Sequence, residues 1–278
     1  MTPTLEFWNL ACPPFDAGPN PDFFFESRAH GEALARLRYF ALDRTMGLAL
    51  VTGEIGAGKT MTLQVLLRRL PVDVYLPVLL YTAPSSPAGV LAAINRALGA
   101  DEADVSAAAS SDVQQRLFAR LLQSRIRESG RYLLIVLDEA QLMEPAALDA
   151  VKCLTNPPPE GGHSPVGVIL SGQPDLKQKL HALPQIYQRL GLVYHLGYLE
   201  RGEVGDYVRH RLRVARAVNP DVFDEACMDL LFRFSAGCPR QINRICKLAV
   251  DRACVLKQVA VDASMVRMIV ADFEKHFS

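Results

Sequence analysis

Two kinds of segment alternate between residues 48 and 196. Short runs of consecutive apolar residues, typical of buried strands, are separated by longer segments in which apolar residues recur every three or four positions, as in amphipathic helices. The predicted strands cover residues 48–51, 72–81, 132–137, 166–170 and 192–196. Pro77 in the second run lacks the N–H that a central strand donates, so we expect a bulge or an edge strand there. The alternation predicts an α/β fold.

The pattern changes at both ends of the chain. Beyond residue 199 the strands stop, and the sequence predicts four amphipathic helices, at 203–216, 224–234, 239–256 and 262–273. Such a change of pattern indicates a small all-helical domain. Residues 1–20 are rich in Pro, Phe and Gly and are expected to be extended, and Ser27 is expected to cap a helix that runs to about residue 42.

The first predicted strand runs into a glycine-rich turn and a helix. Gly53, Gly58, Lys59 and Thr60 match the phosphate-binding pattern G-x-x-x-x-G-K-[ST], in which backbone N–H groups at a helix N-terminus face an anion. Lys59 would neutralise the β- and γ-phosphates, and the Thr60 hydroxyl would hold Mg²⁺. The residues expected to contact the nucleotide here are Gly53, Glu54, Ile55, Gly56, Ala57, Gly58, Lys59, Thr60 and Met61.

Two carboxylates follow the strand at 132–137. The carboxyl ends of strands are where ligands gather in open α/β sheets, so Asp138 is expected to reach the Mg²⁺ shell and Glu139 to activate the water that attacks the γ-phosphate. Acidic residues are also common helix caps, and the alternative is that the pair only caps a helix at 144–154. The phosphate-binding pattern earlier in the chain favours the catalytic interpretation.

The next strand delivers Ser171 and Gln173 to the same predicted edge. Either side chain is suited to hydrogen-bond the γ-phosphate or the attacking water, and the equal alternative is a simple cap for the helix that starts near Leu176.

Composition narrows the choice of partners and compartment. The 278 residues include 30 basic and 30 acidic side chains, so no net charge draws the protein to nucleic acid or anionic lipid. The six cysteines form no C-x-x-C pair, which favours reduced core thiols and a cytoplasmic protein. No apolar run reaches the roughly 18–20 residues of a membrane span, and the N-terminus lacks the features of a signal peptide.

The order of these features resembles the AAA+ ATPases. More narrowly, it resembles the secretion-type ATPases of the general secretion pathway protein A family (ExeA or GspA) and transposition-regulator ATPases of the TnsC and TniB type. The stretches that carry the likeness are 14–15, 20–27, 30–37, 53–60, 137–141, 172–176 and 235–243. The resemblance implies a core with a five-stranded parallel sheet, a C-terminal helical lid, and hydrolysis of Mg-ATP.

The same resemblance assigns three further residues. Gln173 matches the first sensor, Arg240 matches a second sensor that reaches the γ-phosphate from the lid, and Arg189 matches an arginine finger offered to a neighbouring subunit. Each arginine has an alternative as a surface or lid salt bridge. The expected catalytic residues are Lys59, Glu139, Gln173, Arg189 and Arg240; Asp138 and Arg240 join the nucleotide contacts; Thr60 and Asp138 are the expected metal ligands.

The predicted organisation has three parts. Residues 1–26 form an extended segment that packs near the nucleotide, 27–199 form the α/β nucleotide-binding domain, and 200–278 form the helical lid. We expect a nucleotide-dependent homo-oligomer, a ring or a filament.

Three functions remain open at this point. In the first, the ATPase acts on double-stranded DNA with a transposase, through the basic helix at 209–216 and through Arg240, Arg244 and Lys247, although a solvated lid face explains the same basic residues. In the second, the ATPase energises a secretion or envelope-assembly system through a membrane partner. In the third, the protein is a non-hydrolysing nucleotide-binding scaffold.

Overall fold

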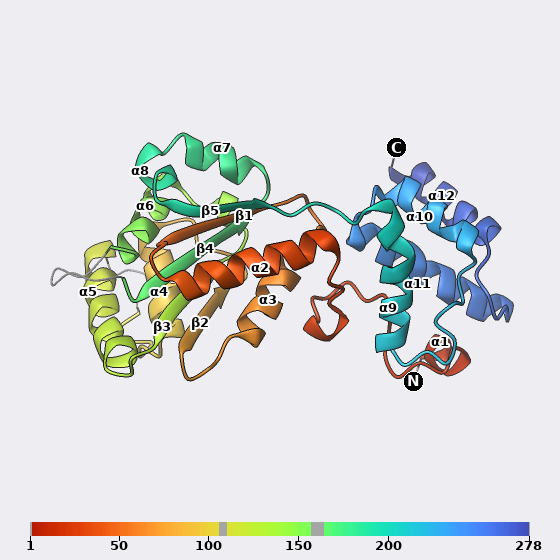
Figure 1. The fold of residues 1–278 in the computed structure, drawn as a ribbon, viewed down its shortest axis with the longest axis horizontal. Coiled ribbons are helices and arrows are strands. Elements are labelled where there is room, and N and C mark those ends of the chain that lie inside the picture. The colour runs from red at the N-terminus through yellow and green to blue at the C-terminus, as the bar shows by residue number, and fades with distance from the viewer. Residues whose placement is uncertain (1, 106–109, 157–163, 278) are drawn as a thin grey trace. The chain divides into compact units, whose positions relative to one another are not determined.

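The computed structural model describes residues 2–105, 110–156 and 164–277 (Figure 1). The chain forms two compact units. A sheet unit consists of residues 32–54 and 62–196, and a helical unit consists of residues 1–31, 55–61 and 197–278. The predicted boundaries after residues 26 and 199 stay predictions.

The sheet unit is built on five parallel strands in the order β2-β3-β4-β1-β5. The strands are β1 (Leu48–Thr52), β2 (Tyr75–Leu80), β3 (Tyr132–Leu137), β4 (Val166–Gly172) and β5 (Leu190–His195). This confirms the predicted α/β fold and five-stranded parallel sheet. β2 is an edge strand, and Pro77 pairs in regular register with Leu134. Its missing N–H is therefore tolerated, as predicted for an edge, and no bulge is needed.

Helices cover both faces of the sheet (Figure 1). On one face, alternate strand residues such as Leu48, Leu50 and Ile135 form a core with apolar residues of α4, α5, α6, α7 and α8. On the other face lie residues 32–43 of α2 and 62–69 of α3, and Tyr75 donates a hydrogen bond to the Ala41 carbonyl of α2. The helices are α2 (Arg28–Asp43), α3 (Lys59–Arg69), α4 (Pro87–Ala97), α5 (Ser111–Leu122), α6 (Pro145–Leu154), α7 (Asp175–His181) and α8 (Pro184–Tyr187). Short helical turns occupy Gln123–Arg127 and Ala140–Leu142.

The helical unit contains the four helices predicted beyond residue 199. They are α9 (Val204–Val214), α10 (Glu225–Ser235), α11 (Pro239–Leu256) and α12 (Ala263–Phe277), preceded by a turn at Arg201–Glu203. Their apolar faces share one core, which also takes in Phe15 from the N-terminal segment. Among the described residues, no helix is long and apolar enough to cross a membrane.

The N-terminal segment differs from the prediction in one place. Residues Pro3–Phe7 form a short helix, α1, where an extended chain is expected from the sequence, and a second turn follows at Pro21–Phe23. Both begin with proline in the first turn, where its missing N–H is not needed and its fixed φ suits a helix. The sequence also predicts loops in the polar segment 101–111 and in the Pro- and Gly-rich segment 156–164, and both segments lie partly outside the described residues.

Candidate functional site

The carboxyl edge of the sheet gathers several of the predicted polar residues. Asp138 follows β3 and is 1 % exposed, and Ser171 near the end of β4 is fully buried. The Ser171 hydroxyl donates a hydrogen bond of 2.7 Å to Asp138 Oδ1. This bond to the neighbouring carboxylate is neither a helix cap nor a phosphate contact, the two roles predicted for Ser171.

Gln141 connects two of the predicted site residues at this edge, Glu139 and Gln173. Its side-chain amide donates to Glu139 Oε2 at 2.6 Å, and its side-chain oxygen accepts the backbone N–H of Gln173 at 3.2 Å. Lys179 donates to the backbone carbonyls of Gln141 and Met143 and so fixes the turn that carries Gln141. The predicted Glu139 and Gln173 are thus brought together through a residue that the sequence did not single out.

Glu139 has the left-handed backbone conformation, with φ 53° and ψ 35°. This conformation is uncommon for a residue with a side chain and costs of order 1 kcal/mol or more, and such residues cluster at functional sites. Within the described residues, neither acid makes a side-chain cap for α6, whose N-cap residue is Glu144. The alternative in which the pair only caps this helix therefore finds no support.

The predicted phosphate loop begins at this same edge. Thr52, the last residue of β1, pairs with Gly172 of β4, and the Gly53 N–H donates to the Gly172 carbonyl at 3.2 Å. A Cβ on Gly53 would lie 2.6 Å from the Leu196 carbonyl oxygen, so only glycine fits here. The first residue of the motif therefore lies on the edge that carries Asp138 and Ser171.

Residues 55–61 of the loop belong to the helical unit. Gly56 and Gly58 have φ values of +83° and +99°, which favour glycine and which turn successive backbone N–H groups toward one side. Lys59 opens α3 and is 6 % exposed, and Thr60 and Met61 follow in its first turn.

Two groups of the helical unit lie directly against this loop. A Cβ on Gly56 would come within 2.8 Å of both Arg240 Cβ and Cys238 Sγ, and a Cβ on Gly58 would come within 2.8 Å of His30 Nε2. The structure thus brings the predicted second sensor, Arg240, to the phosphate loop. His30 is 5 % exposed, and burial is the main cause that lowers its pKa, while its hydrogen bond to the Ala57 carbonyl and the charge of Glu203 raise that pKa.

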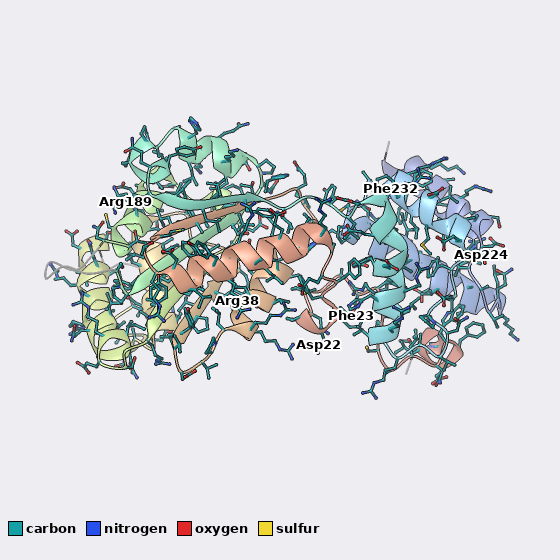
Figure 2. All side chains as sticks on the ribbon, viewed as in Figure 1. Asp22, Phe23, Arg38, Arg189, Asp224 and Phe232 are labelled. Carbon is teal, nitrogen blue, oxygen red and sulfur yellow. The ribbon has the colours of Figure 1, made fainter. Side chains whose placement is uncertain are left out.

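Arg189 lies at the other edge of the sheet. It directly precedes β5, whereas Asp138 and Gly53 follow the strands β3 and β1, and all strands run in parallel (Figure 2). Arg189 Nη1 donates to Asn156 Oδ1 at 2.5 Å, and the side chain lines an open pocket of about 340 Å³ with Thr45, Met46, Thr155 and Gln188. Arg189 is thus separated from the carboxyl edge of its own sheet, which carries Asp138 and Gly53.

The residues present fit a nucleotide and Mg²⁺. A loop with two left-handed glycines offers N–H groups to phosphate, and Lys59 supplies the cation. Among the described residues, no group of three or more His, Cys, Asp or Glu side chains could form a metal cage. Mg²⁺ does not require such a cage, because it is usually held by one or two protein oxygens together with phosphates and water. Thr60 and Asp138 are the residues suited to that role.

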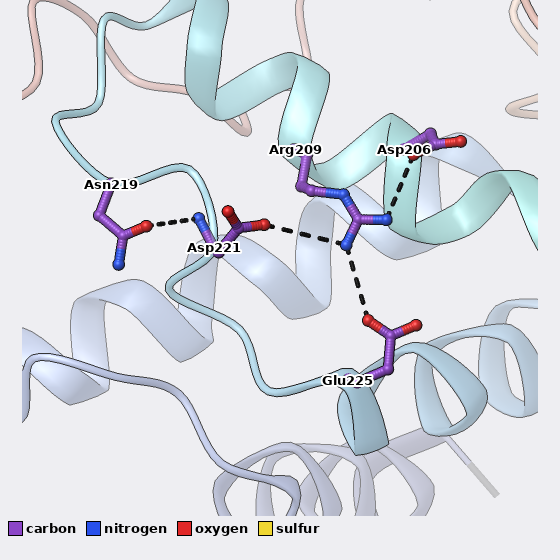
Figure 3. Close-up of polar contacts among 5 residues, drawn as sticks. All are labelled: Asp206, Arg209, Asn219, Asp221 and Glu225. Carbon is purple, nitrogen blue, oxygen red and sulfur yellow. Dashed lines mark hydrogen bonds and ion pairs between the residues drawn. The ribbon is translucent and has the colours of Figure 1, made fainter.

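The basic residues predicted as DNA contacts are largely engaged inside the helical unit. Arg209 pairs with Asp206, Asp221 and Glu225 at 3.2, 3.9 and 3.6 Å (Figure 3). Arg211 is buried and donates to the carbonyls of Pro14 and Asp16. Of the arginines at 209–216, only Arg213 and Arg216 are exposed and make no such ion pair or hydrogen bond with the described residues.

The sequence predicts no role for three residues that support the site, Gln141, His30 and Tyr198. Gln141 and His30 lie inside two stretches that carry the family resemblance, 137–141 and 30–37. That position is a signal that these residues matter, but it does not indicate what they contact. Tyr198, whose hydroxyl donates to the Ile55 carbonyl, is 143 positions away from its partner, and no local pattern marks it.

Comparisons with known proteins agree with this geometry. A family model described as AAA domain (AAA_22) matches residues 42–180, half of the chain, and spans the phosphate loop, both edge carboxylates and Gln173. General secretion pathway protein A of Aeromonas hydrophila is 36% identical over 253 residues, which cover 89% of this chain and 44% of that protein. The chain thus spans less than half of that relative.

Solved structures show the same fold at lower identity. The Aeropyrum pernix ORC2 protein, in ADPNP-ADP complexes, has a TM-score of 0.72 at 20% identity and covers 93% of this chain and 71% of its own. The Aeropyrum pernix ORC1 protein in complex with DNA has a TM-score of 0.69 at 22% identity, with 89% and 66% covered. From the matched model and the geometry of the loop and sheet edge, we conclude that the chain belongs to the AAA domain family.

Proposed function

We propose that this protein binds ATP with Mg²⁺ and hydrolyses it. The observation that carries the proposal is that the phosphate loop begins, at Gly53, on the sheet edge where Asp138, Glu139 and Gln173 are gathered. The start of the phosphate-binding loop and the polar residues suited to activate water therefore lie on the same edge of the sheet, as phosphoryl transfer to water requires. The AAA domain match supports an ATPase over other nucleotide-binding proteins.

Each residue has a defined task in this proposal. The loop N–H groups and Lys59 bind the phosphates, and Thr60 and Asp138 would hold the metal, which neutralises charge that develops on the phosphate oxygens. Glu139 removes a proton from the attacking water. Gln141, bonded to the Glu139 carboxylate, aims that base, and Gln173 and Arg240 contact the γ-phosphate side of the site.

Binding is tested with a fluorescent ATP analogue and Mg²⁺. We expect Lys59→Ala to weaken binding at least tenfold, because a charge-assisted contact to phosphate is lost. Lys177→Ala, which removes an exposed lysine of α7, is the matched control and should bind like the parent. Absence of binding in the parent protein would refute the proposal.

We propose further that the ATPase acts through protein contacts, in a secretion or envelope-assembly system, and not on DNA. The name of the Aeromonas hydrophila relative supports this, as do the zero net charge and the internal ion pairs of Arg209. The DNA-bound ORC1 neighbour supports only the fold.

A binding assay with duplex DNA separates the two proposals. We expect no shift of a random 50-base-pair duplex by this protein with ATP at about 50 mM salt, where nonspecific phosphate contacts are strongest. An ATP-dependent shift that weakens steeply as salt rises would favour the DNA-regulator alternative.

A further inference from the structure

Two carbonyl groups of the phosphate loop are held by side chains of other segments in the helical unit. The Ile55 carbonyl accepts a hydrogen bond from the Tyr198 hydroxyl at 3.0 Å and lies 3.7 Å from Cys238 Sγ. The Ala57 carbonyl lies 2.9 Å from His30 Nε2. The three donors come from distant parts of the sequence: the first turn of α2, the segment after β5, and the residue before α11.

The positions of these carbonyls explain why donors are needed. Each belongs to the residue before a left-handed glycine, Gly56 or Gly58. When such a turn directs its N–H groups to one side to receive an anion, these carbonyls point away from the anion. The Ala57 carbonyl and His30 are buried, where a carbonyl without a donor is disfavoured, whereas the bond between Tyr198 and the Ile55 carbonyl is exposed. Donors at these two points therefore favour the anion-receptive shape of the loop over its alternatives.

The tautomer of His30 follows from its partners. A carbonyl oxygen can only accept, so Nε2 carries the proton that is donated to Ala57. Nδ1 then accepts from the Ser27 hydroxyl at 2.7 Å. The edge-to-face contact with Phe24, at 5.9 Å between ring centroids, fixes the plane of the imidazole. The ring is thus held at both nitrogens and on one side before any ligand is present.

We infer that His30, Tyr198 and Cys238 are positioning residues of the phosphate loop. They hold the loop in the shape that receives a phosphate, and they thereby set the affinity for nucleotide without supplying a phosphate contact of their own. The effect on affinity rests on the proposed function, whereas the effect on the shape of the loop does not.

The test uses two variants and two measurements. Tyr198→Phe removes one hydroxyl, and His30→Leu removes the imidazole donor. Amide hydrogen exchange of the peptide that contains residues 55–61 is measured without nucleotide, and affinity is measured with a fluorescent ATP analogue and Mg²⁺. We expect faster exchange and about fivefold weaker binding in each variant, the size of one lost hydrogen bond.

Two controls separate positioning from a general loss of stability. Tyr75→Phe removes a tyrosine bond of the same kind and length, 3.0 Å to the Ala41 carbonyl, in the sheet unit, and should change neither measurement. His30→Gln keeps an N–H donor on a side chain of similar reach and should recover part of the loss.

The outcomes are distinct. Unchanged exchange of the loop in both variants would overturn the inference, and so would unchanged affinity in a parent protein that binds ATP. A parent protein that binds no ATP would overturn the proposed function, and the exchange data would then decide alone whether these residues hold the loop.

Discussion

At the scale of single residues, Glu139 and its partner Gln141 are the pair on which hydrolysis depends in this account. Glu139 has a strained backbone, and its carboxylate is held by one short hydrogen bond from Gln141. A base that is held in this orientation need not reorient when water arrives, and this lowers the activation free energy of the reaction.

Replacing Gln141 tests this aim. We expect Gln141→Leu to lower the rate of phosphate release by roughly 10- to 150-fold, which corresponds to about 1.5–3 kcal/mol for a hydrogen bond to a charged group, while ATP affinity stays unchanged. Gln178→Leu, on the exposed side of α7, is the matched control. A loss of affinity equal to the loss of rate would show that Gln141 acts on binding instead.

The buried His30 and the half-buried His210 predict how stability depends on pH. Burial lowers the pKa of His30 and of His210, and the charges of Arg211 and Arg213 lower the latter further. In the unfolded chain both take up a proton near pH 6.5, while the folded protein still resists it. We therefore expect the free energy of unfolding to be highest above pH 6.5 and to fall as the pH drops from there through the lowered values.

Denaturant unfolding between pH 7.5 and 5 measures this loss. His30→Gln should make the curve less steep, since one of the two groups is gone. A free energy of unfolding that rises as the pH falls over this range would contradict the lowered pKa of these two histidines in the folded protein.

At the scale of elements, the N-terminal segment is tied to α9 by one buried arginine. Arg211 Nε donates to the Pro14 carbonyl at 2.5 Å and Nη2 to the Asp16 carbonyl at 3.3 Å, and its guanidinium lies 4.7 Å above the ring of Phe23. Irregular backbone with few bonds of its own is thereby joined to a regular helix.

Removing the guanidinium should loosen this segment. We expect Arg211→Met, which keeps most of the apolar volume, to lower the free energy of unfolding by about 2 kcal/mol, because a buried carbonyl loses a charged donor. Early proteolytic cleavage near residues 14–23 should accompany the loss. The exposed Arg213→Met is the control, and equal effects of the two substitutions would contradict this role.

Most elements could be predicted from the sequence, since their signals are local. The apolar runs placed all five strands to within a few residues, and Pro77 marked an edge strand. A short element is missed where its signal is weak: α1 has only five residues, and the sequence predicts an extended chain there.

The site was predictable in its motifs and not in its supports. Glycines, Lys59 and the carboxylates follow fixed spacings, whereas the bonds from Tyr198 and His30 to the loop join residues 143 and 27 positions apart. The periodic pattern of apolar residues along the chain does not indicate contacts between residues so far apart in the sequence.

At the scale of the whole molecule, the position of Arg189 bears on assembly. Because it lies at the amino edge of the sheet, opposite the catalytic edge, its predicted role in hydrolysis requires a second copy of the chain. We therefore expect the protein to be larger by size-exclusion with light scattering when a non-hydrolysable ATP analogue is present.

A mixing experiment tests the contribution of Arg189. Arg189→Ala and Lys59→Ala are each expected to be nearly inactive, since an arginine supplied in trans contributes roughly 10³-fold or more to such rates. An equal mixture should regain part of the activity, because some contacts then pair an intact loop with an intact arginine. A mixture no more active than its components, or a monomer under all conditions, would argue against shared sites.

The proposed ATPase requires that the loop binds ATP and that Glu139 accepts the proton of the water that attacks it. Phosphate release and ATP affinity, measured side by side for the parent, Glu139→Gln and the exposed control Glu144→Gln, test it most directly. We predict that Glu139→Gln binds ATP as the parent does and releases phosphate at least 10²-fold more slowly, the typical contribution of a general base, while Glu144→Gln matches the parent. Equal rates of phosphate release in the parent and Glu139→Gln, or no release in either, would contradict the account.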